Sequence, residues 1–396
     1  MAINNSFCDT FVSSKKDLDF MTIGAIEGLE QKENAVLITG ETCCVKVIFY
    51  KPDMVRIWMD PTKKFKDLTD GVILEKIDYE TPEIKVSEEG EYYKIQSNKC
   101  VIRAFKNPLR FAMYDLRNKT VIWEEELPLQ YSTKSSTQTL KTKEEEYFYG
   151  GGVQNGYFSH KNKKEFIENL ISHWNDGSVS NPVPFYMSTA GYGAFRNTFK
   201  PGVYEFRKTA LTTHNESSFD CFYFYGPSLK QIINGYTELT GRPSLIPRWG
   251  FGIGDADCYN TSNTTYTGTH DKPNKGTTLE VLKVAKAYRD NDMPGSWILP
   301  NDGYGCGYSD LDVVVKEAWN KYGFRVGLWT ENGVEKIAQE VGTLGSRLCK
   351  LDVAWVGPGY EFALNAAKTA YEGIENNTTV TDDKGTYSER GFVWSV

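Results

Sequence analysis

The fold of the C-terminal part of the chain is decided by residues 309–329, which read SDLDVVVKEAWNKYGFRVGLW. Over residues 309–322 the apolar side chains recur every three or four positions, as on one face of a helix: Leu311, Val314, Val315, Ala318, Trp319 and Tyr322. Residues 324–329 then form a short apolar run, which is typical of a buried strand. This stretch therefore predicts a helix followed by a strand.

The same alternation extends over the whole chain after residue 247. We expect strands at Trp249–Gly254, Ser296–Leu299, Phe324–Trp329, Leu348–Trp355 and Gly391–Val396, and further helices at Thr278–Asp290 and Tyr360–Glu375. Such alternation indicates βαβ units on a parallel sheet. Both an open doubly wound sheet and a closed eight-stranded barrel fit this pattern.

The length of this region favours an incomplete barrel. From Pro247 to Val396 the chain is much shorter than the about 250 residues of a complete TIM-type (β/α)8 barrel. The sequence also ends inside a predicted strand, so we expect a fragment or a truncated gene product. The prediction for residues 242–396 is the first half of such a barrel.

The region before residue 242 has the pattern of a β-sandwich. Short segments rich in Val, Ile, Tyr and Phe alternate with turn residues: Ala35–Thr39, Cys44–Tyr50, Val55–Met59, Tyr92–Gln96, Cys100–Phe105, Thr120–Trp123, Phe185–Ser188 and Cys221–Tyr225. The prolines of residues 242–247, RPSLIP, suit a linker. The chain is therefore predicted to be multi-domain, with an N-terminal β-sandwich at 1–241.

Composition narrows the classes of function. A chain with 40% hydrophobic and 24% charged residues is a folded globular protein. Its net charge of −7 and its lack of a long basic run argue against a nucleic-acid partner. No apolar run approaches the about 20 residues that cross a membrane, and the N-terminus lacks a signal-peptide pattern. We expect a cytoplasmic protein, or an extracellular one if an upstream segment is missing.

Neither a metal nor a cofactor is expected. The eight cysteines include no CxxC pair and show no metal-ligand spacing with the four histidines. The glycines of Gly250-x-Gly252-x-Gly254 would suit a dinucleotide loop only if a helix opened directly after them, whereas a loop-forming sequence follows. Nucleotide binding is therefore rejected.

Polar and aromatic residues follow successive predicted strands. Asp257 follows the first strand, Asp302 follows the second, Trp329 ends the third, and Glu331 lies two residues after it. The carboxyl ends of parallel barrel strands open onto one face, where active sites of this architecture lie. Carboxylates bind sugar hydroxyls, and indole rings stack on sugar rings. This pattern predicts a sugar site.

Residues 347–356, RLCKLDVAWV, are the most informative stretch for chemistry. Lys350 and Asp352 are two residues apart, so a strand points both side chains to the same face. Because both faces of a parallel strand are normally buried, two charges there are costly unless they are paired or used. A structural Lys–Asp pair and a catalytic role for Asp352 both remain open on this pattern.

Several motifs resemble glycoside hydrolase family 31. Residues 146–152 (EYFYGGG), 173–176 (HWND) and 184–197 (PFYMSTAGYGAFRN) resemble its N-terminal β-sandwich, and residues 247–252 (PRWGFG) resemble its barrel entry. Together they cover nearly the whole chain from about residue 30. The family's common nucleophile pattern is Trp-x-Asp-Met-Asn-Glu, whereas this chain has Lys-Leu-Asp-Val-Ala-Trp at 350–355. That departure resembles related α-galactosidase families, and the chain looks most like the α-N-acetylgalactosaminidase branch of family 31.

The resemblance implies a retaining exo-α-glycosidase that cleaves terminal α-linked GalNAc or related galacto-configured sugars from oligosaccharides or glycoprotein glycans. Asp352 would be the nucleophile, Lys350 and Asp302 would bind the sugar, and Trp329 would shape its subsite. Asp257 and Glu331 are further candidate substrate-binding residues. The acid/base Asp of the family would lie beyond Val396. The alternatives are α-glucosidase or α-galactosidase activity, or an inactive carbohydrate-binding fragment.

Overall fold

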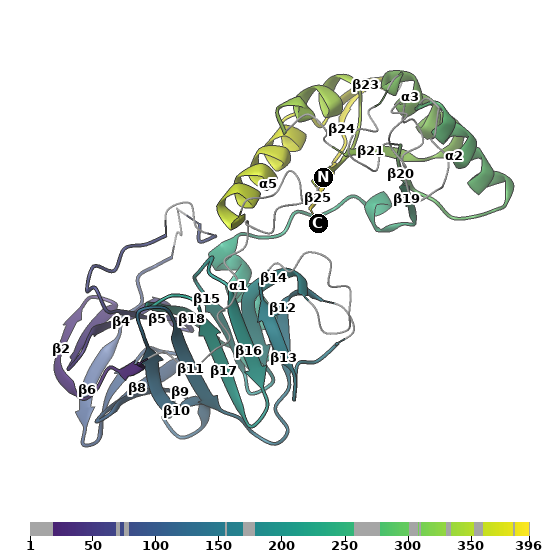
Figure 1. Cartoon of the computed structure of the whole chain (residues 1–396). Helices are drawn as coiled ribbons and strands as arrows, with labels where there is room; N and C mark the ends of the chain where they lie inside the picture. The colour runs from purple at the N-terminus through teal and green to yellow at the C-terminus, as the bar shows by residue number, and fades with distance from the viewer. Residues whose placement is uncertain are drawn as a thin grey trace. The chain divides into compact units, whose positions relative to one another are not determined.

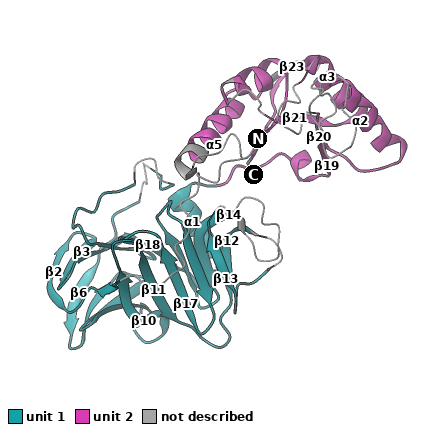
Figure 2. Ribbon diagram, in the orientation of Figure 1, with its two compact units in different colours: residues 1–242 teal, residues 243–396 magenta. Residues whose placement is uncertain are grey.

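The computed structural model describes residues 19–68, 72–74, 79–154, 157–168, 179–256, 278–300, 308, 310–329, 334–351, 359–382 and 385–395. The chain divides into two compact units, residues 1–242 and 243–396 (Figure 2). Strands dominate the first unit, and strands and helices alternate in the second (Figure 1).

The first sheet of the N-terminal unit is antiparallel and runs in the order β13-β16-β17-β11-β10-β9-β8-β7-β6, with β1 also paired to β10. Its strands are β1 (Met21–Thr22), β6 (Lys85–Glu89), β7 (Tyr92–Gln96), β8 (Cys100–Lys106), β9 (Leu109–Asp115), β10 (Val121–Tyr131), β11 (Ser136–Lys141), β13 (Lys164–Ile167), β16 (Gly202–Phe206) and β17 (Thr209–His214).

The second sheet is also antiparallel and runs in the order β12-β14-β15-β18-β5-β4-β3-β2. Its strands are β2 (Ile26–Lys32), β3 (Ala35–Gly40), β4 (Cys44–Lys51), β5 (Met54–Asp60), β12 (Phe148–Gln154), β14 (Val179–Ser188), β15 (Tyr192–Arg196) and β18 (Phe219–Tyr225). Each of the eight strand segments expected from the sequence overlaps an observed strand, so these predictions are confirmed.

The two sheets pack face to face around one apolar core. Trp123 of β10 stacks on Tyr223 of β18, with ring centroids 4.5 Å apart, and Phe148 of β12 stacks on Phe206 of β16 at 4.4 Å. Each fully buried aromatic side chain contributes roughly 1.5–3 kcal/mol of transfer free energy. The expected β-sandwich is therefore present in this unit.

Helix α1 (Leu229–Thr240) was not expected, because the region up to about residue 240 was assigned to strands alone. The Ser228 hydroxyl caps it by accepting from the backbone N–H of Gln231. Tyr236 of the helix stacks on Phe185 of the second sheet, with centroids 3.9 Å apart. The helix thus covers the face of the second sheet that points away from the sandwich core.

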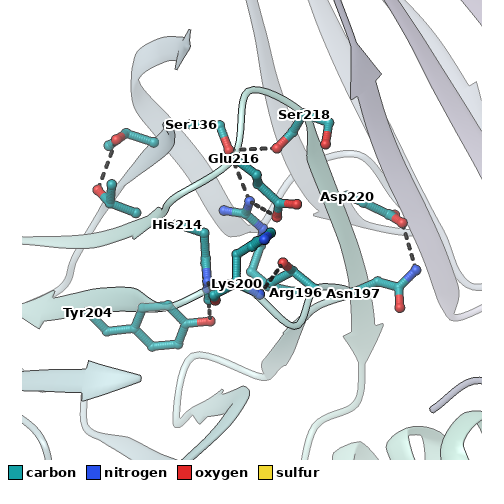
Figure 3. A network of polar contacts seen from close by, with 12 residues as sticks. Ser136, Arg196, Asn197, Lys200, Tyr204, His214, Glu216, Ser218 and Asp220 are labelled. Carbon is teal, nitrogen blue, oxygen red and sulfur yellow. Dashed lines mark hydrogen bonds and ion pairs between the residues drawn. The ribbon is translucent and has the colours of Figure 1, made fainter. Parts of the chain in front are cut away.

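A buried polar network joins the two sheets (Figure 3). Arg196 of β15 is 1% exposed, donates to the Ser136 hydroxyl of β11 at 3.1 Å, and pairs with Glu216 at 3.5 Å. Beside it, the Asp220 carboxylate accepts from Asn197 at 2.7 Å and from two nitrogens of Arg56, each at 2.7 Å. Charges removed from water in this way persist only because they are paired.

The glycine-rich strand β12 is held by a second buried pair. Gly150 has a φ of +122°, and a Cβ there would lie 2.5 Å from the Phe185 carbonyl oxygen. The Gly150 carbonyl accepts from Nε2 of His160 at 2.8 Å, and Nδ1 of His160 donates to the Glu165 carboxylate at 2.9 Å. Both partners offer acceptor oxygens, an arrangement that favours the protonated imidazole. Burial lowers the pKa of His160, but Glu165 raises it by more, and the net pKa lies above its ordinary value.

The C-terminal unit contains a parallel sheet whose strands follow chain order: β19 (Gly254–Ala256), β20 (Trp297–Leu299), β21 (Arg325–Trp329), β22 (Leu348–Leu351) and β25 (Phe392–Ser395). The helical segments are η3 (Arg248–Phe251), α2 (Glu280–Asp290), α3 (Leu311–Tyr322), η4 (Val334–Lys336), η5 (Gln339–Thr343) and α5 (Gly359–Glu375). The expected alternation of strands and helices is confirmed in the described residues.

Helices cover one face of this sheet (Figure 1). Ile298, Val326 and Leu328 pack with α2 and α3, and Cys349 and Leu351 pack with α5. The alternate side chains point to the other face, here called the inner face: Trp297, Leu299, Trp329, Leu348, Lys350 and Trp394.

One local expectation in this unit is wrong. The predicted strand Trp249–Gly254 is a 3-10 turn at Arg248–Phe251, and the strand begins only at Gly254. At Gly250 a Cβ would lie 2.6 Å from the Phe392 ring, so the turn packs closely against β25. A hairpin of β23 (Thr379–Asp382) and β24 (Gly385–Ser388) lies between α5 and β25 in the sequence. Strands in chain order suit a barrel, but closure of the sheet is not observed in the described residues, so the barrel stays a prediction.

We predict that Asp220→Ala lowers the free energy of unfolding of the N-terminal unit by about 3–5 kcal/mol, because it leaves Arg56 buried without its bidentate partner. Urea unfolding of the full chain, followed by circular dichroism, measures the change. Glu88→Ala removes the partner of Lys106 in an exposed pair and is the matched control, with little expected effect. Equal losses in the two variants would contradict the prediction.

Stability should also depend on pH through His160. Its pKa is raised in the folded state, so the pair's contribution is complete below about pH 6.5 and is lost as the pH rises through the folded pKa. We expect His160→Gln to remove this decline in urea unfolding between about pH 5 and pH 9. His214, whose pKa burial holds well below its ordinary value, provides a contrast because its contribution is lost as the pH falls. An unchanged pH profile in His160→Gln would count against the assigned charge.

Candidate functional site

Two of the six predicted site residues lie among the described residues. Trp329 ends strand β21, and Lys350 lies on the neighbouring strand β22. Asp257, Asp302, Glu331 and Asp352 lie outside the described residues. Asp352 follows β22 directly in the sequence, two residues after Lys350.

Trp329, Lys350 and Trp394 form a row across three adjacent strands. Trp329 is paired in register with Lys350, and Lys350 with Trp394 of β25. The ammonium nitrogen of Lys350 lies 5.0 Å from the ring centroid of Trp329 and 5.3 Å from that of Trp394. Trp329 and Lys350 are therefore neighbours on adjacent strands, and their membership of one site stays a prediction.

The two indole rings contribute to the tolerance of a cation at this position. Lys350 is only 9% exposed, and an ammonium group at such a position is costly without compensation. Each ring face lies within the about 6 Å over which a cation is attracted to an aromatic quadrupole, an interaction worth about 2 kcal/mol when desolvated. The row thus holds a positive charge and its N–H donors on the inner face of the sheet.

Trp297 and Trp394 extend the aromatic surface and were not named as site residues from the sequence. Their rings meet edge to face, with centroids 5.8 Å apart. They belong to β20 and β25, which are separated by two strands, or roughly 14 Å in a flat sheet. The contact therefore requires the sheet to curl toward its inner face. The sequence did contain a signal for Trp394. This tryptophan lies within the last predicted strand, Gly391–Val396, just as Trp329 lies at the end of the third predicted strand.

The absence of a side chain at Gly254 makes room for the Trp297 ring. A Cβ added to Gly254 would lie 1.9 Å from an atom of this indole, and Trp297 Nε1 donates to the Gly252 carbonyl at 3.2 Å. The glycines that superficially resemble a nucleotide loop therefore serve to seat an aromatic ring.

Asp255 is the other acidic residue after the first predicted strand. Its carboxylate forms a hydrogen bond on the face of the sheet that the helices cover. The Tyr288 hydroxyl of α2 donates to its carboxylate at 2.8 Å, and this hydrogen bond raises the pKa of Tyr288. Asp255 therefore anchors α2 to β19.

Among the described residues we find no cluster of three or more His, Cys, Asp or Glu side chains arranged to hold a metal ion. Within the same described ranges, no helix has the length and apolarity to cross a membrane.

Comparisons with known proteins point to one group of enzymes. Residues 44–205 match the model of the glycosyl hydrolase 31 N-terminal galactose mutarotase-like domain. The α-glucosidase 2 of Bacillus thermoamyloliquefaciens is 24% identical over 353 residues, which are 85% of this chain and 40% of that protein. An α-xylosidase of Saccharolobus solfataricus is 24% identical over 229 residues, which are 55% of this chain and 27% of that protein.

Solved structures share the fold. A GH31 dextranase from Flavobacterium johnsoniae, solved with isomaltotriose, superposes with a TM-score of 0.76 at 15% identity, over 95% of this chain and 55% of that one. A GH31 α-xylosidase from a soil metagenome, solved with xylose, gives 0.66 at 16% identity, over 88% and 64%. These findings support glycoside hydrolase family 31 as the family of this chain, and none of these four relatives is named an α-N-acetylgalactosaminidase. The chain spans less than half the length of the two curated relatives.

We predict that Gly254→Ala displaces the Trp297 ring, because the added methyl group would overlap it. Overpacking of this kind costs about 1–3 kcal/mol. Near-ultraviolet circular dichroism should show the altered tryptophan environment, and urea unfolding the loss of stability of the C-terminal unit. At Gly28 a Cβ would meet its nearest atom at 3.8 Å, so Gly28→Ala is the control. An unchanged tryptophan spectrum in Gly254→Ala would contradict the described packing.

Proposed function

We propose that this chain is part of a retaining exo-α-glycosidase of family 31, in which Asp352 is the catalytic nucleophile and the C-terminal unit belongs to a (β/α)8 barrel. The observation that carries the proposal is the position of Lys350. Its ammonium group lies on the inner face of a parallel strand, between two indole rings, two residues before Asp352 in the sequence. Cation, aromatic rings and adjacent carboxylate are the groups that a sugar-cleaving site needs.

The proposed chemistry requires two carboxyl groups about 5–5.5 Å apart. The Asp352 carboxylate attacks the anomeric carbon while the bond from that carbon to the leaving oxygen breaks. A carboxylic acid gives its proton to the leaving oxygen, and a covalent glycosyl-enzyme ester forms. Water, deprotonated by the same acid/base group, then hydrolyses the ester. By the family resemblance the acid/base is an Asp on a later barrel strand, and we assign no residue of this chain to that role.

For the substrate we propose a terminal α-linked GalNAc or a related galacto-configured sugar of an oligosaccharide or glycoprotein glycan. The support is the Lys350-Leu-Asp352 motif, in which the cation that donates to sugar hydroxyls lies beside the nucleophile in sequence. Asp302 and Trp329 are proposed to contact the same sugar. Asp257 and Glu331 are proposed as further hydroxyl-binding groups.

A second candidate is α-glucosidase or α-xylosidase activity, which is favoured by the names of the curated relatives. α-Galactosidase activity belongs with the galacto-configured substrates proposed above, because it also rests on the Lys350-Leu-Asp352 motif. A third candidate is glycan binding without turnover. The chain spans less than half the length of those relatives.

The test is hydrolysis of the p-nitrophenyl α-glycosides of GalNAc, galactose, glucose and xylose by the full-length product of the gene that encodes this sequence. We expect turnover of a galacto-configured substrate, and a loss of at least about 10³-fold in kcat for Asp352→Asn, because the amide is not a nucleophile. Turnover of the glucoside or xyloside alone would favour the second candidate.

The matched control is Asp255→Asn, which changes an acid that is bonded to α2 and lies on the helix side of the sheet. It should retain activity if the Asp352 effect is local. Equal losses in both variants would indicate a general defect of the unit. Undiminished turnover in Asp352→Asn would refute the assignment of the nucleophile.

A further inference from the structure

Three segments of the N-terminal unit bring basic side chains together at one end of the first sheet. Strands β13, β16, β17 and β11 are neighbours in that order, and their register pairs Lys164 with Glu205 and Lys141 with Thr209. Residues 141–145, 161–164 and 207–208 therefore lie at the same end of these strands. The segments carry seven cationic side chains, here called the basic cluster: Lys141, Lys143, Lys161, Lys163, Lys164, Arg207 and Lys208.

Hydrogen bonds join the three segments to one another. The Thr142 hydroxyl donates to the Lys208 carbonyl at 2.9 Å, which links the segment after β11 to the turn between β16 and β17. The Lys161 ammonium donates to the Glu144 carbonyl, which links the segment before β13 to the segment after β11. The basic cluster is thus one connected surface and not three independent turns.

Most cations of the basic cluster have no carboxylate partner among the described residues. Lys141 pairs with Glu124 at 2.7 Å, and Lys164 lies 4.0 Å from Glu205. In the part of the chain that the structure describes, the other five cationic side chains form no ion pair. These five charges are therefore available to an anionic ligand.

The positive charge of this surface is set against an acidic chain. Lysines toward the β6 edge of the same sheet differ from the basic cluster, because Lys94 and Lys106 are each paired with a glutamate. The chain as a whole has a net charge of −7. At the basic cluster, by contrast, seven cations outnumber the four solvent-accessible carboxylates that lie on the segments or pair with them: Glu124, Glu144, Glu145 and Glu205.

Two tyrosine rings restrain lysines of the basic cluster. The ammonium nitrogen of Lys161 lies 4.3 Å from the ring centroid of Tyr147, and that of Lys163 lies 4.2 Å from the ring centroid of Tyr157. At exposed sites such cation–π contacts are worth about 0.5–1 kcal/mol. Because the rings limit the motion of these side chains, less conformational entropy is lost when the lysines bind an anion.

The composition of the surface distinguishes between anionic partners. The three segments read KTKEE, KNKK and RK, so they offer no apolar side chain for insertion into a lipid surface. Duplex DNA carries one charge per about 1.7 Å, and the proteins that bind it are strongly basic, whereas this chain is acidic. A polysaccharide with a single carboxylate on each sugar has more widely spaced charges, which a few unpaired cations can match.

We propose that the basic cluster is a binding surface for an acidic polysaccharide, whose carboxylates contact the ammonium and guanidinium groups of Lys143, Lys161, Lys163, Arg207 and Lys208. All of these residues belong to the N-terminal unit, whereas the proposed nucleophile Asp352 belongs to the C-terminal unit. The inference therefore goes beyond the proposed function and does not depend on turnover.

The experiment measures binding of fluorescein-labelled polygalacturonate to the 396-residue chain by fluorescence anisotropy at low ionic strength. The fully methyl-esterified polymer has the same backbone without charge and is the ligand control. We expect the parent chain to bind polygalacturonate but not the ester, with an affinity that falls as salt is added. The triple variant Lys161→Gln, Arg207→Gln, Lys208→Gln should bind at least tenfold more weakly.

The matched control is the triple variant Lys85→Gln, Lys94→Gln, Lys106→Gln, which removes the same charge from β6, β7 and β8 and should bind like the parent chain. Circular dichroism checks that both variants are folded. If the change at Lys161 disturbs folding, the double variant of the exposed turn, Arg207→Gln with Lys208→Gln, should still lose at least threefold in affinity.

Several results would overturn the inference. They are a parent chain that does not bind polygalacturonate, equal binding of the ester, and equal losses in the two triple variants. Tighter binding of duplex DNA or of phosphatidylserine vesicles than of polygalacturonate would also overturn it. The catalytic proposal is tested separately, because turnover by the full-length Asp352→Asn variant leaves the binding data for the basic cluster unchanged.

Discussion

The burial of the Lys350 ammonium between two indole rings is the constraint on which the C-terminal unit depends. Helices cover one face of this parallel strand, so a cation can lie only on the opposite face. The positive charge must be compensated there, because its burial is costly. Trp329 and Trp394 contribute to this compensation from the two neighbouring strands. The Lys350 side chain is thereby linked to the register of β21, β22 and β25. It is also linked to the exposure of the Trp394 ring and to the direction of its own ammonium group.

The N-terminal unit meets the same physical demand in another way. Its buried charges are compensated by direct ion pairs and hydrogen bonds, as between Arg56 and Asp220, or between Arg196, Ser136 and Glu216. Arg196 and Ser136 belong to different sheets, so the network resists sliding of one sheet over the other. The C-terminal unit uses such pairs as well, since Arg347 is 4% exposed and lies 3.5 Å from the Glu389 carboxylate.

Much of this fold could be predicted from the sequence because the hydrophobic periods are clear. The three-to-four residue spacing of Leu311, Val314 and Ala318 predicted a helix that begins and ends within two residues of α3. Predictions failed where another force decides the local structure. The run at Trp249 is apolar enough for a strand, but the close packing of Gly250 against Phe392 makes it a turn. Helix α1 was overlooked among aromatic strands, although Leu229, Ile232 and Tyr236 recur at the three-to-four residue spacing of a helix directly after the Ser228 cap.

The candidate site was predictable only in part, for a similar reason. Alternation along one strand placed Lys350 opposite in direction to Cys349 and Leu351, and this is observed. The contact between Trp297 and Trp394 depends on the curl of the sheet, which no local pattern encodes, so these rings were not recognised as members of the site. Where Asp352 lies relative to this row remains a proposal.

Strand β12 also bears on how the protein behaves at high concentration. It lies at the edge of its sheet, where unpaired amides would otherwise recruit strands from other molecules. Its three consecutive glycines all have positive φ, and its pairing with β14 shifts register twice. An incoming strand would find few amides in line along this edge. The glycine run thus protects the molecule against self-association while it shapes the strand.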